Sequence, residues 1–302
     1  MEKFYETIFL KSDSTLESKL DNLKRINKIN NDEYYMLQKG INGEKQVQYH
    51  LGKSNIGMYA LRDINLKCED LKAQVDFVLV TSHHCYFVEC KNYNADIIHV
   101  DETRNFEMST RYGKKYNKMG IKSPLSQVDD QLNVFKKICL NNQEQTKELL
   151  NGIRFKDYFK TMVVFTNPEN RLNIKKAPRD IKYRILKVDN LIRQIEYDDK
   201  HYTGKRLTKT QIENMANYIL SNNVQVEIEQ LEPIEYVEPI EMNRTNKKQG
   251  DSPLSNLKNG LIKFIQVMLI LYLIAAISSC ANYIDQNNDN HSNTQNRINS
   301  TR

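Results

Sequence analysis

The first fifty residues carry apolar side chains at the spacing of amphipathic helices. From Ser14 to about Leu51, groups of Leu, Ile, Tyr and Val recur at steps of three and four residues, which places them on one side of a helix. The pattern is interrupted near Asn30–Asn31 and again near Gly40–Gly43, and both residue types are common where helices end. We therefore expect helices in this segment, with breaks at these two places.

Three runs rich in β-branched and aromatic residues follow and predict strands: Met58–Leu66, Ala73–Thr81 and Cys85–Asn92. A short connection containing His83–His84 separates the last two runs. Two adjacent histidines suggest a metal site, but neighbouring residues in a strand or turn point apart, and no third ligand stands at a usual spacing. We therefore interpret the pair as an exposed turn in an antiparallel meander.

The remaining pattern predicts further helices and strands. Ser123 is a suitable N-cap, and Pro124 a suitable first-turn residue, for a helix that runs to about Leu140. The polar, Lys- and Tyr-rich stretch before it, Thr103–Lys122, is expected to be a loop. Two strands and a closing helix are expected at Tyr158–Phe165, Arg184–Val188 and Lys209–Ser221. This order of elements predicts an α/β domain with a mixed β-sheet flanked by helices.

The C-terminal part has the composition of a linker followed by a membrane helix. Residues 224–260 contain spaced prolines among Glu, Asn and Lys without a sustained period, which indicates a linker. Residues 261–281 are almost entirely apolar and, at about 1.5 Å per residue, span roughly 30 Å, the thickness of a bilayer core. A buried core helix is the alternative, but the segment has no polar face. We therefore predict one C-terminal transmembrane helix, followed by a polar tail at residues 282–302.

Charges beside this segment predict its orientation. Five Lys and Arg residues lie just before it or at its start, whereas the tail has only Arg297 and Arg302, both far from it. By the positive-inside rule, the N-terminal part faces the cytoplasm. The N-terminus also lacks the apolar stretch of a secretory signal. We expect a single-pass protein of the cell membrane that contacts the lipid bilayer through residues 261–281, with a helical segment at 1–39 and an α/β domain at 40–223.

Composition narrows the function only slightly. The 302 residues include 44 Lys and Arg against 38 Asp and Glu, and the resulting net charge of +6 is weak evidence for a nucleic-acid partner. The five cysteines form no CxxC pair and lie in apolar or strand-like runs, as expected of reduced thiols. The composition therefore argues against a disulfide-rich secreted protein.

Two of the predicted strands place charged side chains within apolar runs. Asp76 lies in the second strand, and Glu89 and Lys91 lie in the third. Residues i and i+2 of an extended strand share a face, so Glu89 and Lys91 point the same way. If the two strands are antiparallel neighbours, their short connection folds Asp76 back toward Glu89. The pattern predicts two carboxylates and an ammonium group in one place; a cross-strand salt bridge on a solvated face is the alternative.

These groups suit metal-assisted hydrolysis of a phosphodiester bond. The carboxylates of Asp76 and Glu89 are hard oxygen donors for Mg²⁺ or Mn²⁺, and the backbone carbonyl of Cys90 is a further candidate ligand. Lys91 would orient or help to deprotonate the attacking water and would stabilise the charge that grows on the phosphate. The sequence therefore predicts a metal-dependent nuclease site.

Four motifs surround these residues in a fixed order: Gly43-Glu44-x-x-Val47 on a helix, Gln74–Val80, Phe87–Tyr93, and Ser123–Gln127 at the start of the next helix. Together they resemble the nuclease-related domain (NERD) family, which is grouped with the PD-(D/E)xK nucleases, over about residues 40–195. The resemblance implies a restriction-endonuclease-like core with Asp76, Glu89 and Lys91 at the catalytic positions.

The resemblance also implies supporting roles for two helical residues. Glu44 matches the family's helix-borne acidic position and is a further candidate metal ligand, and Gln127 matches a polar residue beside the site. The chain departs from the family in two loops. His83–His84 replaces the usual turn glycine, and Asn94–Ala95 stands where the family prefers a glycine.

The polar stretch before the Ser123 helix mixes cations with aromatic rings: Arg111, Tyr112, Lys114, Lys115, Tyr116 and Lys118. Such a loop could contact phosphates and stack on bases, although a merely solvated loop fits equally well. The sequence therefore favours a membrane-tethered nuclease that acts on DNA, or on RNA. A catalytically inactive nucleic-acid-binding or scaffolding module at the membrane is the main alternative, and a membrane-linked signalling component is a more distant one.

Overall fold

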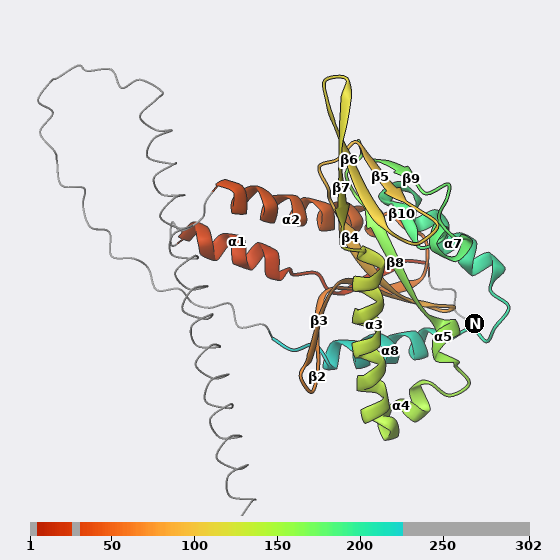
Figure 1. Cartoon of the computed structure of the whole chain (residues 1–302). Coiled ribbons are helices and arrows are strands. Elements are labelled where there is room, and N and C mark those ends of the chain that lie inside the picture. Colours follow the sequence, from red (N-terminus) through yellow and green to blue (C-terminus); the bar gives the residue numbers. More distant parts are fainter. Residues whose placement is uncertain (1–4, 26–30, 226–302) are drawn as a thin grey trace, which may run out of the picture. The chain divides into compact units, whose positions relative to one another are not determined.

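The computed structural model describes residues 5–25 and 31–225, all within the first of two structural units, Met1–Glu235 (Figure 1). No helix in these two ranges is long and apolar enough to cross a membrane. The predicted transmembrane helix at 261–281 and the polar tail lie outside the described residues, as does almost all of the predicted linker.

A six-stranded sheet forms the centre of the described part. Its order is β1-β2-β3-β4-β8-β10, with strands at Thr7–Lys11, Met58–Cys68, Leu71–Thr81, Cys85–Lys91, Phe159–Phe165 and Ile185–Lys187. Strands β2, β3 and β4 are antiparallel, whereas β1, β8 and β10 pair with their neighbours in parallel. The sheet is therefore mixed, and with helices on its faces it confirms the predicted α/β class.

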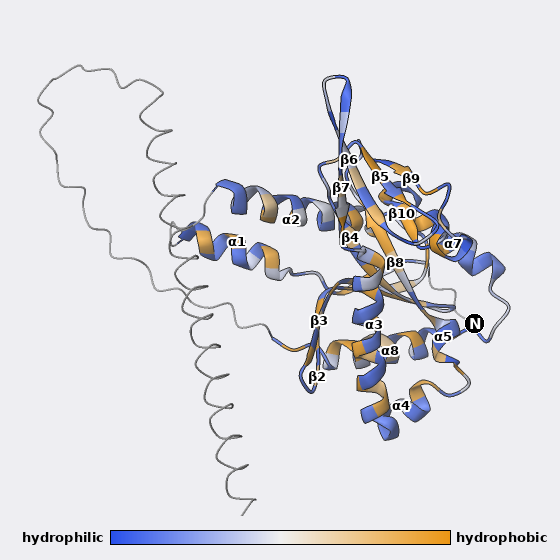
Figure 2. Ribbon diagram, in the orientation of Figure 1, coloured by the Kyte–Doolittle hydropathy of each residue, from blue (hydrophilic) through white to orange (hydrophobic). Residues whose placement is uncertain are grey.

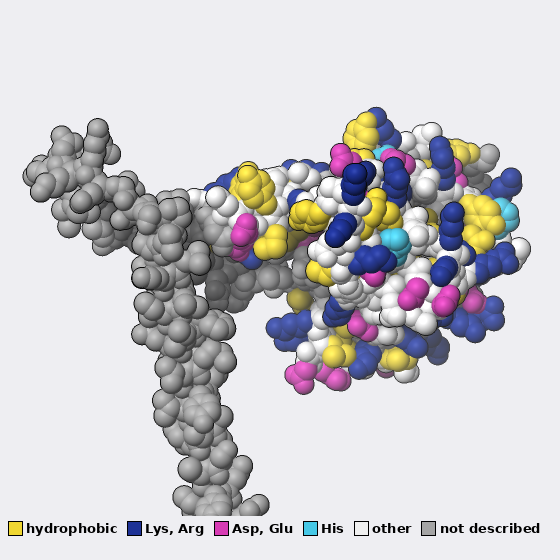
Figure 3. Space-filling view, turned by 45° about the horizontal axis from the view of Figure 1, so that its top comes forward, with side chains coloured by type: hydrophobic (Ala, Val, Ile, Leu, Met, Phe, Trp, Pro, Cys, Tyr) yellow, Lys and Arg dark blue, Asp and Glu magenta, His cyan; other side chains and the backbone are white. Residues whose placement is uncertain are grey.

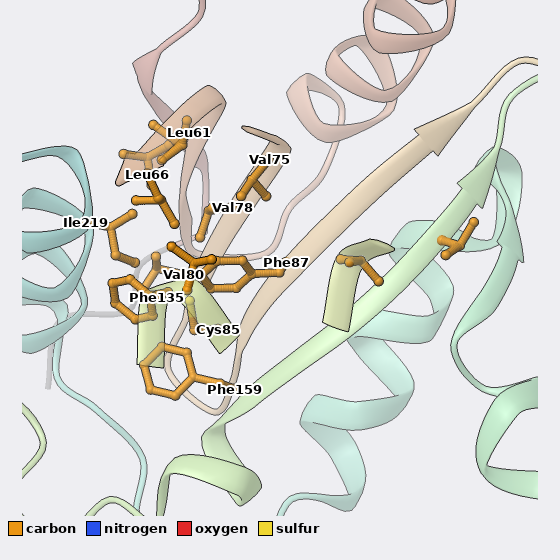
Figure 4. Packing of buried hydrophobic residues seen from close by; sticks show 14 of the residues in the cluster. Leu61, Leu66, Val75, Val78, Val80, Cys85, Phe87, Phe135, Phe159 and Ile219 are labelled. Carbon is orange, nitrogen blue, oxygen red and sulfur yellow. The ribbon is translucent and has the colours of Figure 1, made fainter. Parts of the chain in front are cut away.

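Strand alternation divides the core between the two faces of this sheet. Val78 and Phe87 pack in one apolar cluster with α3 (Pro124–Asn141) and α8 (Lys209–Ser221), as Figure 4 shows. Phe77 and Val88 pack in a second cluster with α2 (Asn31–Gly52) and α7 (Leu191–His201). Because both faces are covered, the central strands are apolar on both sides, and their hydrophobic colouring stands out in Figure 2. A polar side chain on the covered part of these strands, such as Glu89, therefore points into a protein layer.

The polar stretch expected to be a loop is a hairpin instead. Strands β6 (Phe106–Tyr112) and β7 (Lys115–Ile121) pair antiparallel, and Gly113 in their turn has φ +58. They extend a second sheet, ordered β7-β6-β5-β9, with β5 at Ile97–Val100 and β9 at Arg171–Asn173. The prediction was wrong because both faces of the hairpin are largely exposed, so the period-two hydrophobic signal of a strand is missing.

The N-terminal segment differs from its prediction in two ways. Strand β1 was not foreseen; its five residues are too few to show a period. Helix α1 (Thr15–Arg25) follows as expected, but α2 runs without interruption through Gly40 and Gly43. A Cβ on Gly43 would lie 2.9 Å from Oγ1 of Thr166, so this glycine allows close packing and does not end the helix.

The remaining predicted helices and strands are close to those observed. Ser123 caps α3 by accepting the N–H of Ser126 at 3.2 Å, and Thr208 and Gln211 form a capping box on α8. Short helices α4 (Gln143–Leu149), α5 (Phe155–Tyr158) and α6 (Arg179–Lys182), and a 3₁₀ turn at Val188–Asn190, complete the described part. Its four cysteines are free thiols, as predicted, and Cys280 lies outside it.

The turn between β3 and β4 is buried, which corrects the prediction of an exposed turn at His83–His84. The two residues are 0% and 8% exposed, because α7 and the chain after it cover the turn. The hydroxyl of Tyr86 lies 3.1 Å from Nε2 of His83 and 3.3 Å from Nδ1 of His84, and it donates to Asp198 at 3.1 Å. Sequence spacing gave no sign of this cover, since it comes from more than 100 residues away.

We predict that this buried pair makes the fold sensitive to acid. Burial lowers the pKa of His83 to about 4, although Asp199 opposes the shift, and burial lowers the pKa of His84 to about 3. The unfolded chain takes up protons below about pH 6.5 and the folded chain does not, so stability should fall from pH 7 to pH 5 by on the order of 1–2 kcal/mol per histidine.

Urea unfolding of the full chain at both pH values measures this effect. His83→Gln and His84→Gln should flatten the dependence on pH, whereas His201→Gln, at an exposed position, should not. Parallel curves for all three variants and the parent would contradict the assignment.

Candidate active site

Asp76 and Glu89 lie opposite each other on neighbouring strands. The antiparallel register pairs Phe77 with Val88, so the next residues toward the open end of the ladder are Asp76 on β3 and Glu89 on β4. Both side chains face α3, because Gln127 and Gln131 of this helix donate to Glu89 and line a cavity together with Asp76. The backbone N–H of Cys90 donates to Oδ2 of Asp76 at 2.7 Å, which fixes that carboxylate beside β4.

Glu89 is buried, with 2% exposure, and its carboxylate is held from two elements. Nε2 of Gln127 on α3 donates to Oε1 at 2.7 Å, and Nζ of Lys91 donates to the same oxygen. Lys91 also donates to Oε1 of Gln127 at 3.1 Å. The structure thus brings together four of the five predicted site residues: Asp76, Glu89, Lys91 and Gln127.

Gln131 completes this arrangement and was missed in the sequence. Its Nε2 donates to Oε2 of Glu89 at 2.8 Å and to the backbone carbonyl of Gln74 at 2.6 Å. The signal was available, because Gln127 and Gln131 are four residues apart and therefore lie on the same face of α3. The four-residue spacing alone places Gln131 beside Gln127, and so beside Glu89.

Glu44, the fifth predicted residue, is engaged elsewhere. It lies on α2, which packs on the opposite face of the sheet, and its Oε2 accepts Nε of Arg62 at 2.9 Å and Oγ of Ser14 at 3.0 Å. The Glu44 and Arg62 side chains are 5% and 2% exposed, so they form a buried ion pair. Glu44 is near enough to raise the pKa of Asp76, but its carboxylate is committed to Arg62.

The surroundings of Asp76 disfavour the charged form of its carboxyl group in the protein alone. Burial raises the pKa of Asp76 well above its usual range; Glu89 and Glu44 raise it further, while the Cys90 N–H and Lys91 oppose them. A carboxylate whose charge is this unfavourable in the protein alone gains strongly from a divalent ion.

Lys91 is held as an ammonium group. Burial by itself would lower the pKa of Lys91, but the adjacent Glu89 outweighs burial, and the pKa is raised. At neutral pH the Lys91 side chain is therefore a cation. A charged ammonium group cannot take a proton from water, so the deprotonating role expected from the sequence does not apply to the metal-free protein.

A cavity of about 850 Å³ opens between β3 and α3 beside these residues. Asp76, Gln127 and Gln131 line it, and so do four lysines: Lys72, Lys122, Lys136 and Lys137. Positive charge at the rim attracts phosphates by long-range forces, while the carboxylate lies inside. The cavity thus pairs a basic rim with an acidic interior.

The donor set fits a hard divalent cation. The described residues contain no group of three or more His, Cys, Asp and Glu side chains that could hold a metal ion. Mg²⁺ needs only one or two carboxylates and takes its other ligands from water and substrate oxygens, so Asp76 and Glu89 are a sufficient protein contribution. The C=O of an extended residue points to the same strand edge as its N–H, so the Cys90 carbonyl also faces β3.

Comparison with known proteins identifies the region that carries this site. Residues 39–166 match the family model of the nuclease-related domain, NERD. The matched range includes Asp76, Glu89, Lys91, Gln127 and Glu44, and it confirms the resemblance recognised in the sequence. Neither a curated protein nor a solved structure matches the chain.

We predict that Asp76→Asn stabilises the protein at neutral pH. Asparagine keeps an acceptor for the Cys90 N–H and removes a charge that burial and Glu89 disfavour, so the free energy of unfolding should rise by about 1–2 kcal/mol. The raised pKa means that this gain is complete only above the pKa of Asp76 in the folded protein. It should vanish toward pH 4, where the parent carboxyl is protonated.

Urea unfolding of the full chain between pH 4 and pH 8 tests this prediction, with Asp21→Asn on the exposed side of α1 as the matched control. Added Mg²⁺ should stabilise the parent and leave Asp76→Asn unchanged. A loss of stability in Asp76→Asn at pH 8 would show that the carboxylate is a structural partner.

Proposed function

We propose that this chain is a metal-dependent nuclease that hydrolyses phosphodiester bonds of DNA, or of RNA, on a restriction-endonuclease-like core. The match of residues 39–166 to the nuclease-related domain supports the class of activity. The observation that carries the proposal is the placement of Asp76 opposite Glu89, with Lys91 on the same face and a lysine-rimmed cavity beside them.

Each residue has a distinct task in this proposal. Asp76 and Glu89 hold Mg²⁺ or Mn²⁺, with the Cys90 carbonyl as a further oxygen donor. When bound, the ion polarises the phosphoryl group and supplies an activated water molecule. Gln127 and Gln131 keep the Glu89 carboxylate in one orientation, since each donates to a different oxygen.

Lys91 is the cation that faces the reacting phosphate. In the metal-free protein Glu89 raises the pKa of Lys91 against the effect of burial, so the side chain is a charged ammonium group that donates hydrogen bonds to Glu89 and Gln127. A metal ion on Glu89 would compete for the same carboxylate, which would leave Lys91 available to stabilise charge on the phosphate. The proposed role is therefore electrostatic.

A cleavage assay with matched variants tests this function. The full chain in a mild non-ionic detergent is incubated with duplex DNA, single-stranded DNA and RNA in Mg²⁺, Mn²⁺ or EDTA. We expect cleavage only with metal, and a loss of about 10²-fold or more in Asp76→Asn, Glu89→Gln and Lys91→Met. Asp130→Asn makes the same charge change in the same cavity without touching Glu89, and should stay near the parent rate. Cleavage no greater than that of Lys91→Met on every substrate would contradict the proposal.

One observation favours a second candidate, a non-catalytic nucleic-acid-binding or scaffolding module. The buried acids already have partners within the chain, since Lys91 neutralises Glu89 and Arg62 neutralises Glu44. The charges of Glu89 and Glu44 are therefore compensated without a metal. On this reading, Asp76→Asn would leave nucleic-acid binding and cellular function intact.

We further propose that residues 261–281, outside the described residues, tether the nuclease to the cell membrane with its α/β domain in the cytoplasm. Their length and apolar composition support this location, as do the positive charges on their N-terminal side. Such a nuclease would meet entering or membrane-attached nucleic acid first.

Cell fractionation tests the tether. The full chain should sediment with membranes and resist extraction by high salt and alkali, whereas a chain ending at residue 260 should be released. Recovery of the full chain in the soluble fraction would contradict the tether, and full cellular function of an active chain ending at 260 would contradict the importance of its location.

A further inference from the structure

The β6–β7 hairpin forms a ribbon that extends from the second sheet (Figure 1). Every residue from Arg111 to Gly120 is exposed, including Tyr112 at 72% and Tyr116 at 48%. The ribbon thus presents two aromatic rings to solvent, where the bases and sugars of a nucleic acid could contact them. Four cations against the single acid Glu107 give this ribbon a positive charge.

Cross-strand pairing places a tyrosine and a cation on both faces of the ribbon. Tyr112 pairs with Lys115 on one face, and Arg111 pairs with Tyr116 on the other. A ribbon that lay flat on a membrane or a protein would need such groups on one face only. A tyrosine and a cation on each face suit a ribbon that enters a groove with a phosphate backbone on either side.

The size of the ribbon fits such a groove. Ser109 is buried at the root and pairs with Lys118, and three residues of each strand, or roughly 10 Å, lie between this pair and the turn. The major groove of B-form DNA is about 8.5 Å deep and 12 Å wide, and it admits a two-stranded β-ribbon. The exposed length is therefore close to the depth that the ribbon would need to reach the bases.

The root of the ribbon is also the edge of the catalytic cavity. Strand β7 ends at Ile121, and the next residue, Lys122, lines the cavity together with Asp76 and Gln127. The β6 strand is also held by the residue before β5, because the N–H of Arg111 donates to Oδ2 of Asp96 at 2.6 Å. A duplex held by the ribbon would thus be held next to the carboxylates. Lys and Arg side chains are prominent on the upper face in Figure 3.

We propose that the β6–β7 ribbon enters the major groove of duplex DNA. The bound ribbon places the phosphodiester backbone of that DNA at the site formed by Asp76 and Glu89. This inference rests on the proposed nuclease function and names its substrate as duplex DNA. The lysines and Arg111 contact phosphates on the two walls of the groove, and the tyrosines contact sugars and base edges.

The test measures binding in EDTA, where no metal-dependent cleavage occurs. Thr110 and Asn117 pair across the ribbon, so residues 111–116 can be replaced by an Asn-Gly turn that keeps the strands in register. Anisotropy titrations compare this shortened protein with the parent on four probes: a DNA duplex, an RNA duplex and a DNA single strand of the same sequence, and vesicles rich in phosphatidylserine. Thermal unfolding checks that the shortened protein is folded.

The shortened protein should lose at least tenfold in affinity for the DNA duplex and less than threefold for the RNA duplex, whose major groove is too narrow for a ribbon. Lys114→Gln with Lys115→Gln should reduce the slope of log affinity against log salt on duplex DNA by about 2. Lys147→Gln with Lys200→Gln removes the same charge from α4 and α7 and should leave the slope unchanged.

Several results would overturn the inference. Equal losses on DNA and RNA duplexes would indicate charge attraction alone, an equal or larger loss on the single strand would indicate base stacking, and a loss confined to vesicles would indicate a membrane contact. Unchanged binding to every probe would also overturn it. These titrations measure binding without cleavage. Groove binding by the ribbon can therefore be disproved while metal-dependent cleavage is confirmed, and cleavage can be disproved while groove binding is confirmed.

Discussion

The antiparallel register between β3 and β4 is the constraint on which the site depends. Pairing of Phe77 with Val88 puts Asp76 opposite Glu89 and turns both toward α3. A slip of one residue would move Asp76 to the α2 face and bring Phe77 into its place. The apolar layers prevent such a slip, because both faces of these strands are buried and each would then present the wrong side chains. The hydrophobic core therefore determines which carboxylates can meet.

The site is at the same time a costly part of this core. Two carboxylates face each other in a layer otherwise built from Val, Phe and Ile, and the raised pKa of Asp76 records the cost of that placement. The Cys90 N–H, the two α3 glutamines and Lys91 offset part of it without removing the charge. Such a compromise is common where a protein keeps groups ready for chemistry, since stability and function then make opposite demands on the same residues.

The sequence predicted the central part of the structure because the signals there are local. Strand parity placed Glu89 and Lys91 on one face, and the short connection placed Asp76 beside them, as the register shows. It failed where distant segments decide the outcome. The cover over His83 and His84 comes from α7, and the ion pair that occupies Glu44 comes from Arg62 on β2. The exposed β6–β7 ribbon was missed for a different reason. Both faces of its strands are largely exposed to solvent, so the alternation of apolar and polar residues that marks a strand is absent.

The buried ion pair of Arg62 and Glu44 also affects how substitutions at these two positions should be interpreted. Removing either charge alone leaves the other stranded in the core, at a cost of about 3–5 kcal/mol, whereas replacing both by apolar groups of similar volume is far less harmful. The two positions are thus constrained to change together over evolutionary time. The ion pair therefore gives Glu44 a structural role that is separate from any contribution to the site. An inactive Glu44 variant would be informative about catalysis only if its fold were intact.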